Sequence, residues 1–178
     1  DLLAQAEHDT AAQAILMTDD AGLGRDVAAA VERQLRRLPR GNIAGASWAT
    51  FGAVIILRSL EEAPALADRI AAEHLEIATA DPDRLAAKIR NAGAIFLGRH
   101  TPEAIGDYVA GSNHVLPTAR SARFSSGLGV LDFMKRTSIL RLNQSALAQL
   151  SDAAMILAEA EGLGAHRRSV EIRRARKQ

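Results

Sequence analysis

Three short apolar runs decide the fold of this chain: Ala53-Val-Ile-Ile-Leu57, His74-Leu-Glu-Ile-Ala-Thr79 and Ala94-Ile-Phe-Leu-Gly98. Each has the length and the β-branched or aromatic content of a buried strand. Helix signals lie between them. Ser59 and Glu62 predict a capped helix that runs to about residue 72, and Asp81-Pro82 opens another that runs to about residue 92. Because strand and helix alternate with short connections, the sequence favours a mostly parallel α/β sheet.

The alternation extends toward the N-terminus. Residues 1–13 are rich in Ala and Leu and predict a helix, and the apolar run 14–18 predicts a strand. Apolar residues at helical spacing predict a helix over 25–38, and residues 41–48 predict a loop with a short helix. Residues 1–118 are therefore expected to form a Rossmann-like α/β domain, a mostly parallel sheet flanked by helices. Such sheets bind ligands beyond the carboxyl ends of their strands.

The alternation ends after residue 118, and the chain is polar and glycine-rich as far as residue 129. Beyond it the pattern predicts helices at 130–136, 144–161 and from 164 onward, and a short strand at 138–142. We therefore place a domain boundary near residue 118, with a mainly helical C-terminal extension over 119–178.

The bulk composition is that of an ordinary globular protein, with 48% apolar and 24% charged residues and a net charge of +1. This charge and an aromatic content of 3% argue against nucleic-acid binding, although the end of the chain, 173–178, is basic. No apolar run approaches the roughly 18 residues of a membrane span. The chain has no cysteine, which excludes disulfides and thiolate metal sites and fits a cytoplasmic location.

Side chains suited to metal binding or proton transfer gather in one segment, Gly106-Asp-Tyr-Val-Ala-Gly-Ser-Asn-His-Val-Leu-Pro-Thr118. It has neither helix nor strand periodicity and is predicted to be an ordered loop that follows a helix start at Thr101-Pro102. Asp107, Asn113 and His114 supply a carboxylate, an amide and an imidazole, and loops of this kind on rigid scaffolds often carry function. Taken alone, the segment is equally compatible with an Asn-capped turn beside a surface histidine.

Two further pairs of polar residues suit the chemistry of a site. Gln5 and His8 stand one helical turn apart, so both side chains can reach one metal ion, although an ordinary pair on a helix surface has the same spacing. Glu73 and His74 lie at a helix-to-strand junction, where both can be directed into one cleft. Two adjacent bases suit a reaction that removes a proton from an alcohol and also activates a water. The alternative is a surface glutamate beside a histidine at the end of a strand.

Five motifs together resemble one enzyme family. They are Gln5-Ala-Glu-His8; Ala72-Glu73-His74-Leu75; Thr101-Pro-Glu103 with Gly106-Asp-Tyr108; Gly111-x-Asn113-His-Val-Leu-Pro-Thr118; and Glu161-Gly-Leu163 with His166. In this order and at these separations they look like histidinol dehydrogenase, over essentially the whole chain. Members of that family make L-histidine from L-histidinol through an enzyme-held aldehyde, in two oxidations that each pass a hydride to NAD.

The resemblance implies a role for each matching residue. Glu73 and His74 match the acid/base pair, with His74 taking the alcohol proton and Glu73 activating water for the second oxidation. A zinc ion that binds substrate, rather than doing redox work, is implied at four ligands: Gln5, His8, Asp107 and His166. Substrate contacts are implied at these four ligands and at His74, His114 and Glu161. The resemblance also implies a homodimer, in which Glu161 and His166 of one subunit are expected to reach the active site of the other.

The resemblance further implies that the residues that bind NAD precede residue 1, because family members are more than twice as long as this chain. No Gly-x-Gly-x-x-Gly follows a strand here. We therefore expect the C-terminal segment of a zinc- and NAD-dependent dehydrogenase, with no cofactor-binding residues for NAD in this chain and no nucleic-acid or membrane partner. The alternative is a non-catalytic metal-binding or assembly fragment that lacks the NAD-binding half.

Overall fold

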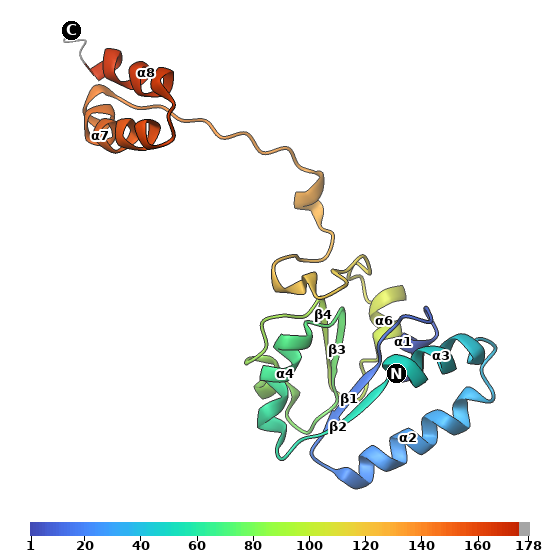
Figure 1. Ribbon diagram of the computed structural model, residues 1–178. Helices are drawn as coiled ribbons and strands as arrows, with labels where there is room; N and C mark the ends of the chain where they lie inside the picture. The colour runs from blue at the N-terminus through green and yellow to red at the C-terminus, as the bar shows by residue number, and fades with distance from the viewer. Residues whose placement is uncertain (175–178) are drawn as a thin grey trace. The chain divides into compact units, whose positions relative to one another are not determined.

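The computed structural model describes residues 1–174 and divides into two compact units, residues 1–133 and 134–178. The first unit combines strands and helices, and the second contains a pair of helices (Figure 1). Residues 175–178 of the basic end lie outside the described residues. The domain boundary near residue 118 stays a prediction.

The first unit contains four strands in two parallel pairs. β1 (Ile15–Thr18) pairs with β2 (Ala53–Ile56), and β3 (His74–Ile77) pairs with β4 (Ala94–Leu97). Parallel neighbours need a crossover connection, and helices provide it in each pair. These helices are α2 (Ala21–Leu35) and α3 (Gly41–Phe51) between β1 and β2, and α5 (Pro82–Ala86) between β3 and β4. The predicted α/β class, with parallel strands flanked by helices, is confirmed (Figure 1).

Small buried side chains hold the N-terminal helix, α1 (Leu2–Ala6), in the core beside α2 and α3. The buried cluster consists of Leu3, Ala6, Ala14, Val31 and Ala44. Ala6 and Ala44 are fully buried, so the helices that carry them can approach closely. The fully buried Ser47 of α3 donates a hydrogen bond of 2.8 Å to the carbonyl of Ala12. This packing fixes the direction in which α1 presents Gln5.

Several helices differ in length from their predictions. The predicted helix 1–13 ends at Ala6, because the Asp9 carboxylate accepts the N–H of Ala11 at 2.8 Å and forms a turn that competes with the helix. Residues 41–48, predicted as a loop with a short helix, are helical throughout as part of α3, whose small residues allow tight packing. The predicted helix 59–72 is a 3₁₀ turn, η1 (Leu60–Glu62), followed by α4 (Ala63–Ile70), and it stops at Ala71, which has a left-handed φ of 51°.

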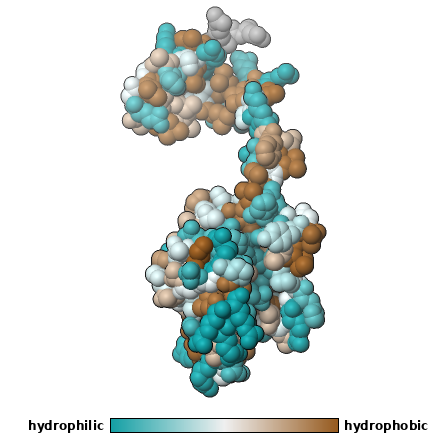
Figure 2. Space-filling model, turned by 90° about the vertical axis from the view of Figure 1, so that its right-hand side faces the viewer, coloured by the Kyte–Doolittle hydropathy of each residue, from teal (hydrophilic) through white to brown (hydrophobic). Residues whose placement is uncertain are grey.

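The region after β4 also differs in detail. The start of the predicted loop 106–118 belongs to a helix, α6 (Glu103–Tyr108), and two 3₁₀ turns follow, η2 (Ser121–Arg123) and η3 (Val130–Phe133). The predicted strand at 138–142 is wrong: no strand forms there in the described chain, and Ile139 and Leu140 are 92% and 84% exposed without a neighbouring strand to pair with. Hydrophobic side chains lie at the surface of this connecting segment (Figure 2).

The second unit is a helical hairpin, α7 (Gln144–Ala160) and α8 (Gly164–Arg174). The Asn143 side chain caps α7 by accepting the N–H of Ala146 at 2.8 Å. Gly162, with a φ of 71°, makes the turn that a residue with a side chain would adopt only with strain. None of the helices in residues 1–174 is both long and apolar enough to cross a membrane.

Candidate active site

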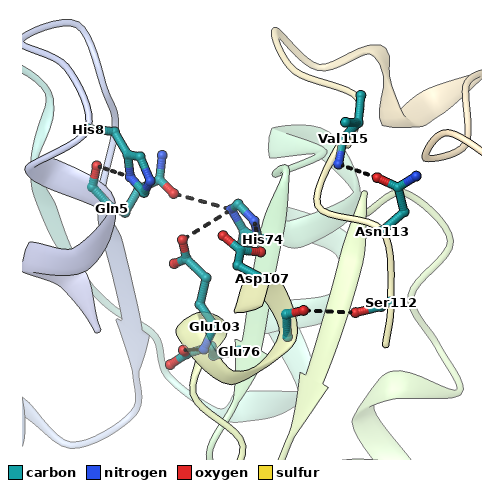
Figure 3. Close-up of polar contacts among 10 residues, drawn as sticks. Gln5, His8, His74, Glu76, Glu103, Asp107, Ser112, Asn113 and Val115 are labelled. Carbon is teal, nitrogen blue, oxygen red and sulfur yellow. Dashed lines mark hydrogen bonds and ion pairs between the residues drawn. The ribbon is translucent and has the colours of Figure 1, made fainter. Parts of the chain in front are cut away.

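The candidate site is centred on His74, the first residue of β3 (Figure 3). Its side chain is only 9% exposed. The ring lies beside the buried Phe96 of β4, with 5.9 Å between ring centroids. Polar groups from two other elements approach its two nitrogens from different sides. β3 therefore fixes the backbone of the histidine, and its neighbours determine how the ring can turn.

Helix α6 brings two carboxylates to the imidazole. Glu103 and Asp107 stand four residues apart, so they share one face of the helix. Glu103 Oε1 lies 3.6 Å from His74 Nδ1, and Asp107 Oδ1 lies 3.5 Å from His74 Nε2. Both separations are electrostatic contacts rather than hydrogen bonds. Each of the two acidic side chains therefore faces one nitrogen of the ring.

The position of α6 is set by β3 and β4. The Glu76 carboxylate, two residues after His74 and thus on the same strand face, accepts the backbone N–H of Glu103 at 2.8 Å. Gly106 lies so close to Phe96 that a Cβ there would stand 2.4 Å from the ring carbon Cε1. A glycine is therefore needed for α6 to approach the strand pair this closely, and this close approach places the carboxylates beside the imidazole.

Helix α1 approaches the same ring from another direction. Gln5 Oε1 lies 3.3 Å from His74 Nδ1, across 69 positions of sequence. His8 is exposed, one turn further along the chain, and its Nδ1 lies 3.4 Å from the backbone oxygen of Gln5 (Figure 3). The Arg40 guanidinium stabilises the C-terminal end of α1 by donating hydrogen bonds to the carbonyls of Glu7 and His8, at 2.9 and 3.3 Å. Three residues proposed from sequence, Gln5, His74 and Asp107, thus converge.

The charge balance of this cluster affects the Glu103 carboxyl most. Burial raises the pKa of Glu103, a positive charge on His74 would oppose that rise, and the Asp107 carboxylate adds to it. The physical cause is the loss of water around an acid that is 6% exposed. Ionising Glu103 therefore costs free energy of desolvation, and a cation bound beside the carboxylate would offset that cost.

Three side chains offer potential cation ligands at one point. Atoms of His74, Glu103 and Asp107 all lie within 4.8 Å of one another. Nitrogen and carboxylate oxygen suit zinc, and the described chain supplies them without sulfur. This set shares Asp107 with the ligand set expected from sequence but contains His74 and Glu103 in place of Gln5, His8 and His166.

The loop after α6 carries His114 at the surface. Asn113 makes the turn by accepting the N–H of Val115 at 2.8 Å, and Ser112 donates to the carbonyl of Gly106 at 3.2 Å (Figure 3). His114 is exposed, and its ring makes no hydrogen bond or ion pair within residues 1–174. The loop is anchored at its far end, where the guanidinium groups of Arg120 and Arg123 both donate to the carbonyl of Arg69 in the last turn of α4.

Glu73 immediately precedes the strand and is half-buried. Its carbonyl accepts the N–H of Ala94 at 2.8 Å, which fixes its backbone at the edge of the β3–β4 pair. Its carboxylate makes no hydrogen bond or ion pair within the described part of the chain. A half-buried carboxylate that is not engaged elsewhere is free to act on a bound water.

The remaining candidates belong to the second unit. Glu161 is the C-terminal capping residue of α7, and His166 lies in the first turn of α8; both are exposed. The Ser169 hydroxyl donates to the backbone carbonyl of His166 at 2.9 Å, and the imidazole of His166 makes no hydrogen bond or ion pair within residues 1–174. His100, for which no function is expected, is exposed in the turn after β4.

Sequence reasoning assigned no role to Glu103 or Glu76. The signal for Glu103 was present in the helix start Thr101-Pro-Glu103 followed by Asp107 one turn later. The alternation of β3 likewise places Glu76 on the face of His74. What the pattern did not contain is the packing of α6 on Phe96, which turns that helix face toward the imidazole.

Comparison with known proteins bears on the whole chain. The family model described as histidinol dehydrogenase matches residues 1–174. The chain is 70% identical to histidinol dehydrogenase of Agrobacterium fabrum and 71% identical to that of Nitrobacter winogradskyi, over 97% of this chain and 40% of each relative. A crystal structure of histidinol dehydrogenase from Elizabethkingia anophelis superposes with a TM-score of 0.79 at 36% identity, again over 97% of this chain and 40% of the other. The chain thus spans about two fifths of the length of the relatives it matches.

Proposed function

The chain belongs to the histidinol dehydrogenase family, and from this premise we propose that it is the C-terminal segment of an NAD-dependent enzyme that oxidises L-histidinol to L-histidine in two steps. The observation that carries the proposal is the environment of His74. Its buried Nε2 has no hydrogen-bond partner in residues 1–174 and lies 3.5 Å from Asp107. An imidazole nitrogen that is positioned but unsatisfied is suited to accept a proton from a bound alcohol.

The donor set beside His74 supports a zinc site. Gln5 and Asp107 both approach the imidazole, and His8 follows Gln5 by one helical turn. Two oxygens and a nitrogen, without thiolate, suit an exchangeable zinc ion, and His166 would complete four ligands. When bound, the zinc would supply a Lewis-acidic cation that holds the imidazole and amine of the substrate.

The two oxidations divide the proton chemistry between neighbouring residues. His74 takes the hydroxyl proton of histidinol at Nε2 while the carbon-bound hydride leaves to NAD. The resulting aldehyde must be hydrated before a second hydride can leave, and Glu73 removes a proton from the attacking water. Two features favour Glu73 as the base that activates water. Its carboxylate makes no hydrogen bond or ion pair within residues 1–174, and its backbone is fixed by the hydrogen bond that its carbonyl accepts from Ala94. His114 and Glu161 contact the substrate.

The second unit is assigned to a subunit contact. Three large apolar side chains of α7 are exposed to solvent: Leu150 at 56%, Ile156 at 67% and Leu157 at 64%. Exposed apolar side chains gathered on one element are typical of an interaction surface. A homodimer would cover it and would bring His166 and Glu161 to the site of the partner subunit. The family also supports a place in histidine biosynthesis in the cytoplasm.

Product analysis tests the proposed function. A full-length enzyme that contains this segment, supplied with L-histidinol and excess NAD, should form two NADH for each histidinol consumed and release L-histidine. Supplied with the aldehyde, it should form one NADH. A zinc-loaded enzyme that reduces no NAD with either compound would instead support the alternative of a non-catalytic metal-binding or assembly module.

A further inference from the structure

The two nitrogens of His74 have chemically different surroundings. Nδ1 faces two oxygens, the amide oxygen of Gln5 at 3.3 Å and a carboxylate oxygen of Glu103 at 3.6 Å. An amide oxygen can only accept a hydrogen bond, so the neutral ring satisfies this side only when Nδ1 carries the hydrogen. Nε2 is then left with its lone pair; it has no hydrogen-bond partner within residues 1–174, and the one oxygen that faces it, Oδ1 of Asp107 at 3.5 Å, belongs to a residue expected to bind zinc.

Gln5 alone cannot ensure this arrangement in the proposed enzyme, because its side-chain oxygen is also expected to bind zinc. Glu103 is the other acceptor that faces Nδ1. Its side chain is 8% exposed, and the imidazole is the only group with which its carboxylate forms an ion pair or hydrogen bond within the described part of the chain. Hydrogen bonds around a catalytic histidine are often long before substrate binds, so a separation of 3.6 Å suits a contact that shortens in the complex.

The carboxylate is held in place through the backbone. Glu76 accepts the N–H of Glu103, and Phe96 supports α6 at Gly106 and His74 at its ring. Burial also raises the pKa of Glu103, so keeping this carboxyl ionised destabilises the fold. A gain in fold stability therefore does not explain why a carboxylate is buried here. A buried acid aimed at one edge of an imidazole is the arrangement by which a carboxylate selects a histidine tautomer.

We propose that Glu103 is a positioning residue for His74: it accepts the Nδ1–H and so keeps the Nε2 lone pair directed at the substrate. The role rests on the proposed function. In the alcohol oxidation the hydroxyl proton passes to Nε2, the C–H hydride with its electron pair passes to the oxidised nicotinamide of NAD, and a C=O bond forms. Glu103 stabilises the imidazolium that results and takes no proton itself.

The test uses the full-length enzyme with Glu103→Gln, which keeps the size of the side chain but removes its charge and can present N–H groups to Nδ1. Exposed Glu32 on α2, changed to Gln, is the matched control. Single-turnover NADH formation should show the alcohol step slowed about 100-fold or more in Glu103→Gln, with KM within about threefold of wild type. Zinc content should be unchanged and the thermal midpoint no lower than in wild type.

A double-mutant cycle and a spectroscopic readout separate this role from a structural one. In a His74→Ala background, Glu103→Gln should cause no further loss of the alcohol step. A second, additive loss, a loss of zinc, or a normal rate would overturn the proposal. NMR of 15N-histidine-labelled enzyme should show His74 with hydrogen on Nδ1, and a shift toward the other tautomer in Glu103→Gln. Hydrogen on Nε2 in the wild type would overturn the proposal whatever substrate the enzyme oxidises, so its failure is distinct from failure of the proposed function.

Discussion

Replacing Gly93 with alanine should damage both the stability and the chemistry of the site. A Cβ at Gly93 would stand 2.5 Å from the carbonyl oxygen of Glu73 and 3.2 Å from Cδ of Pro117. Neither atom belongs to a side chain that can rotate away, so the β3 backbone would have to move by several tenths of an ångström. Overpacking of this kind costs about 1–3 kcal/mol, and the hydrogen bond between Ala94 N–H and Glu73, 2.8 Å long, is worth about 1 kcal/mol more.

The expected loss for Gly93→Ala is therefore about 2–4 kcal/mol, measured as a lower urea midpoint with an unchanged slope. Because the strained carbonyl belongs to Glu73 and precedes His74, turnover should fall about 100-fold as well. Gly45 is the matched control: it lies in α3, and a Cβ there would meet no atom within 4 Å. Gly45→Ala should stabilise the protein by about 0.5–1 kcal/mol at normal turnover. Wild-type stability and turnover in Gly93→Ala would refute this reasoning.

Subunit exchange between two inactive variants, His166→Ala and His74→Ala, should restore about a quarter of wild-type activity, because half of the dimers are mixed and each then has one intact site. No recovery would place His166 in the site of its own subunit. Glu73→Gln should slow single-turnover oxidation of the aldehyde more than that of the alcohol; an equal loss in both steps would contradict its role with water. Glu61→Gln should lower the thermal midpoint at neutral pH, since hydrogen bonds from Lys88 and Arg84 lower the pKa of Glu61. A lowered pKa stabilises the fold above the unfolded value and ceases to do so as the pH falls through the folded pKa, so the difference from wild type should vanish in acid; a difference independent of pH would contradict this.

The strands could be predicted closely because their signal is local. Each of the four apolar runs became a strand within one or two residues of the predicted bounds, since a buried strand needs only a short run of apolar residues bounded by turns. The run at 138–142 has the same local signal but no partner to pair with, and it forms no strand. Pairing is a property of the whole chain, so the pattern alone overpredicted here.

Helix ends were less predictable, because they depend on single side chains that compete for backbone groups. Asp9 ends the first helix by capping a turn. Ala71 ends α4 by adopting a left-handed conformation, which could not be predicted because alanine does not favour it. In the opposite direction, residues 41–51 lack a clear amphipathic pattern and still form a full helix, because Ala44 and Ser47 pack against the N-terminal segment.

The candidate site shows the same division between local and tertiary information. Motif spacing brought forward Gln5, His74 and Asp107, which the fold places around one imidazole although they are far apart in sequence. Glu103 gained importance only from the packing of α6 against Phe96, which no sequence period encodes. Roles for Glu161 and His166 depend on a partner subunit, so they stay predictions from the family resemblance.

Zinc content of purified full-length enzyme tests the assignment of the site most directly. The wild type should hold about one zinc ion per chain, and alanine at any of the four proposed ligands, Gln5, His8, Asp107 and His166, should lower that content. Glu103→Gln and His100→Ala should retain the metal. Full zinc content in the His8 and His166 variants, together with loss of zinc in Glu103→Gln, would contradict the account and place the cation among His74, Glu103 and Asp107 instead.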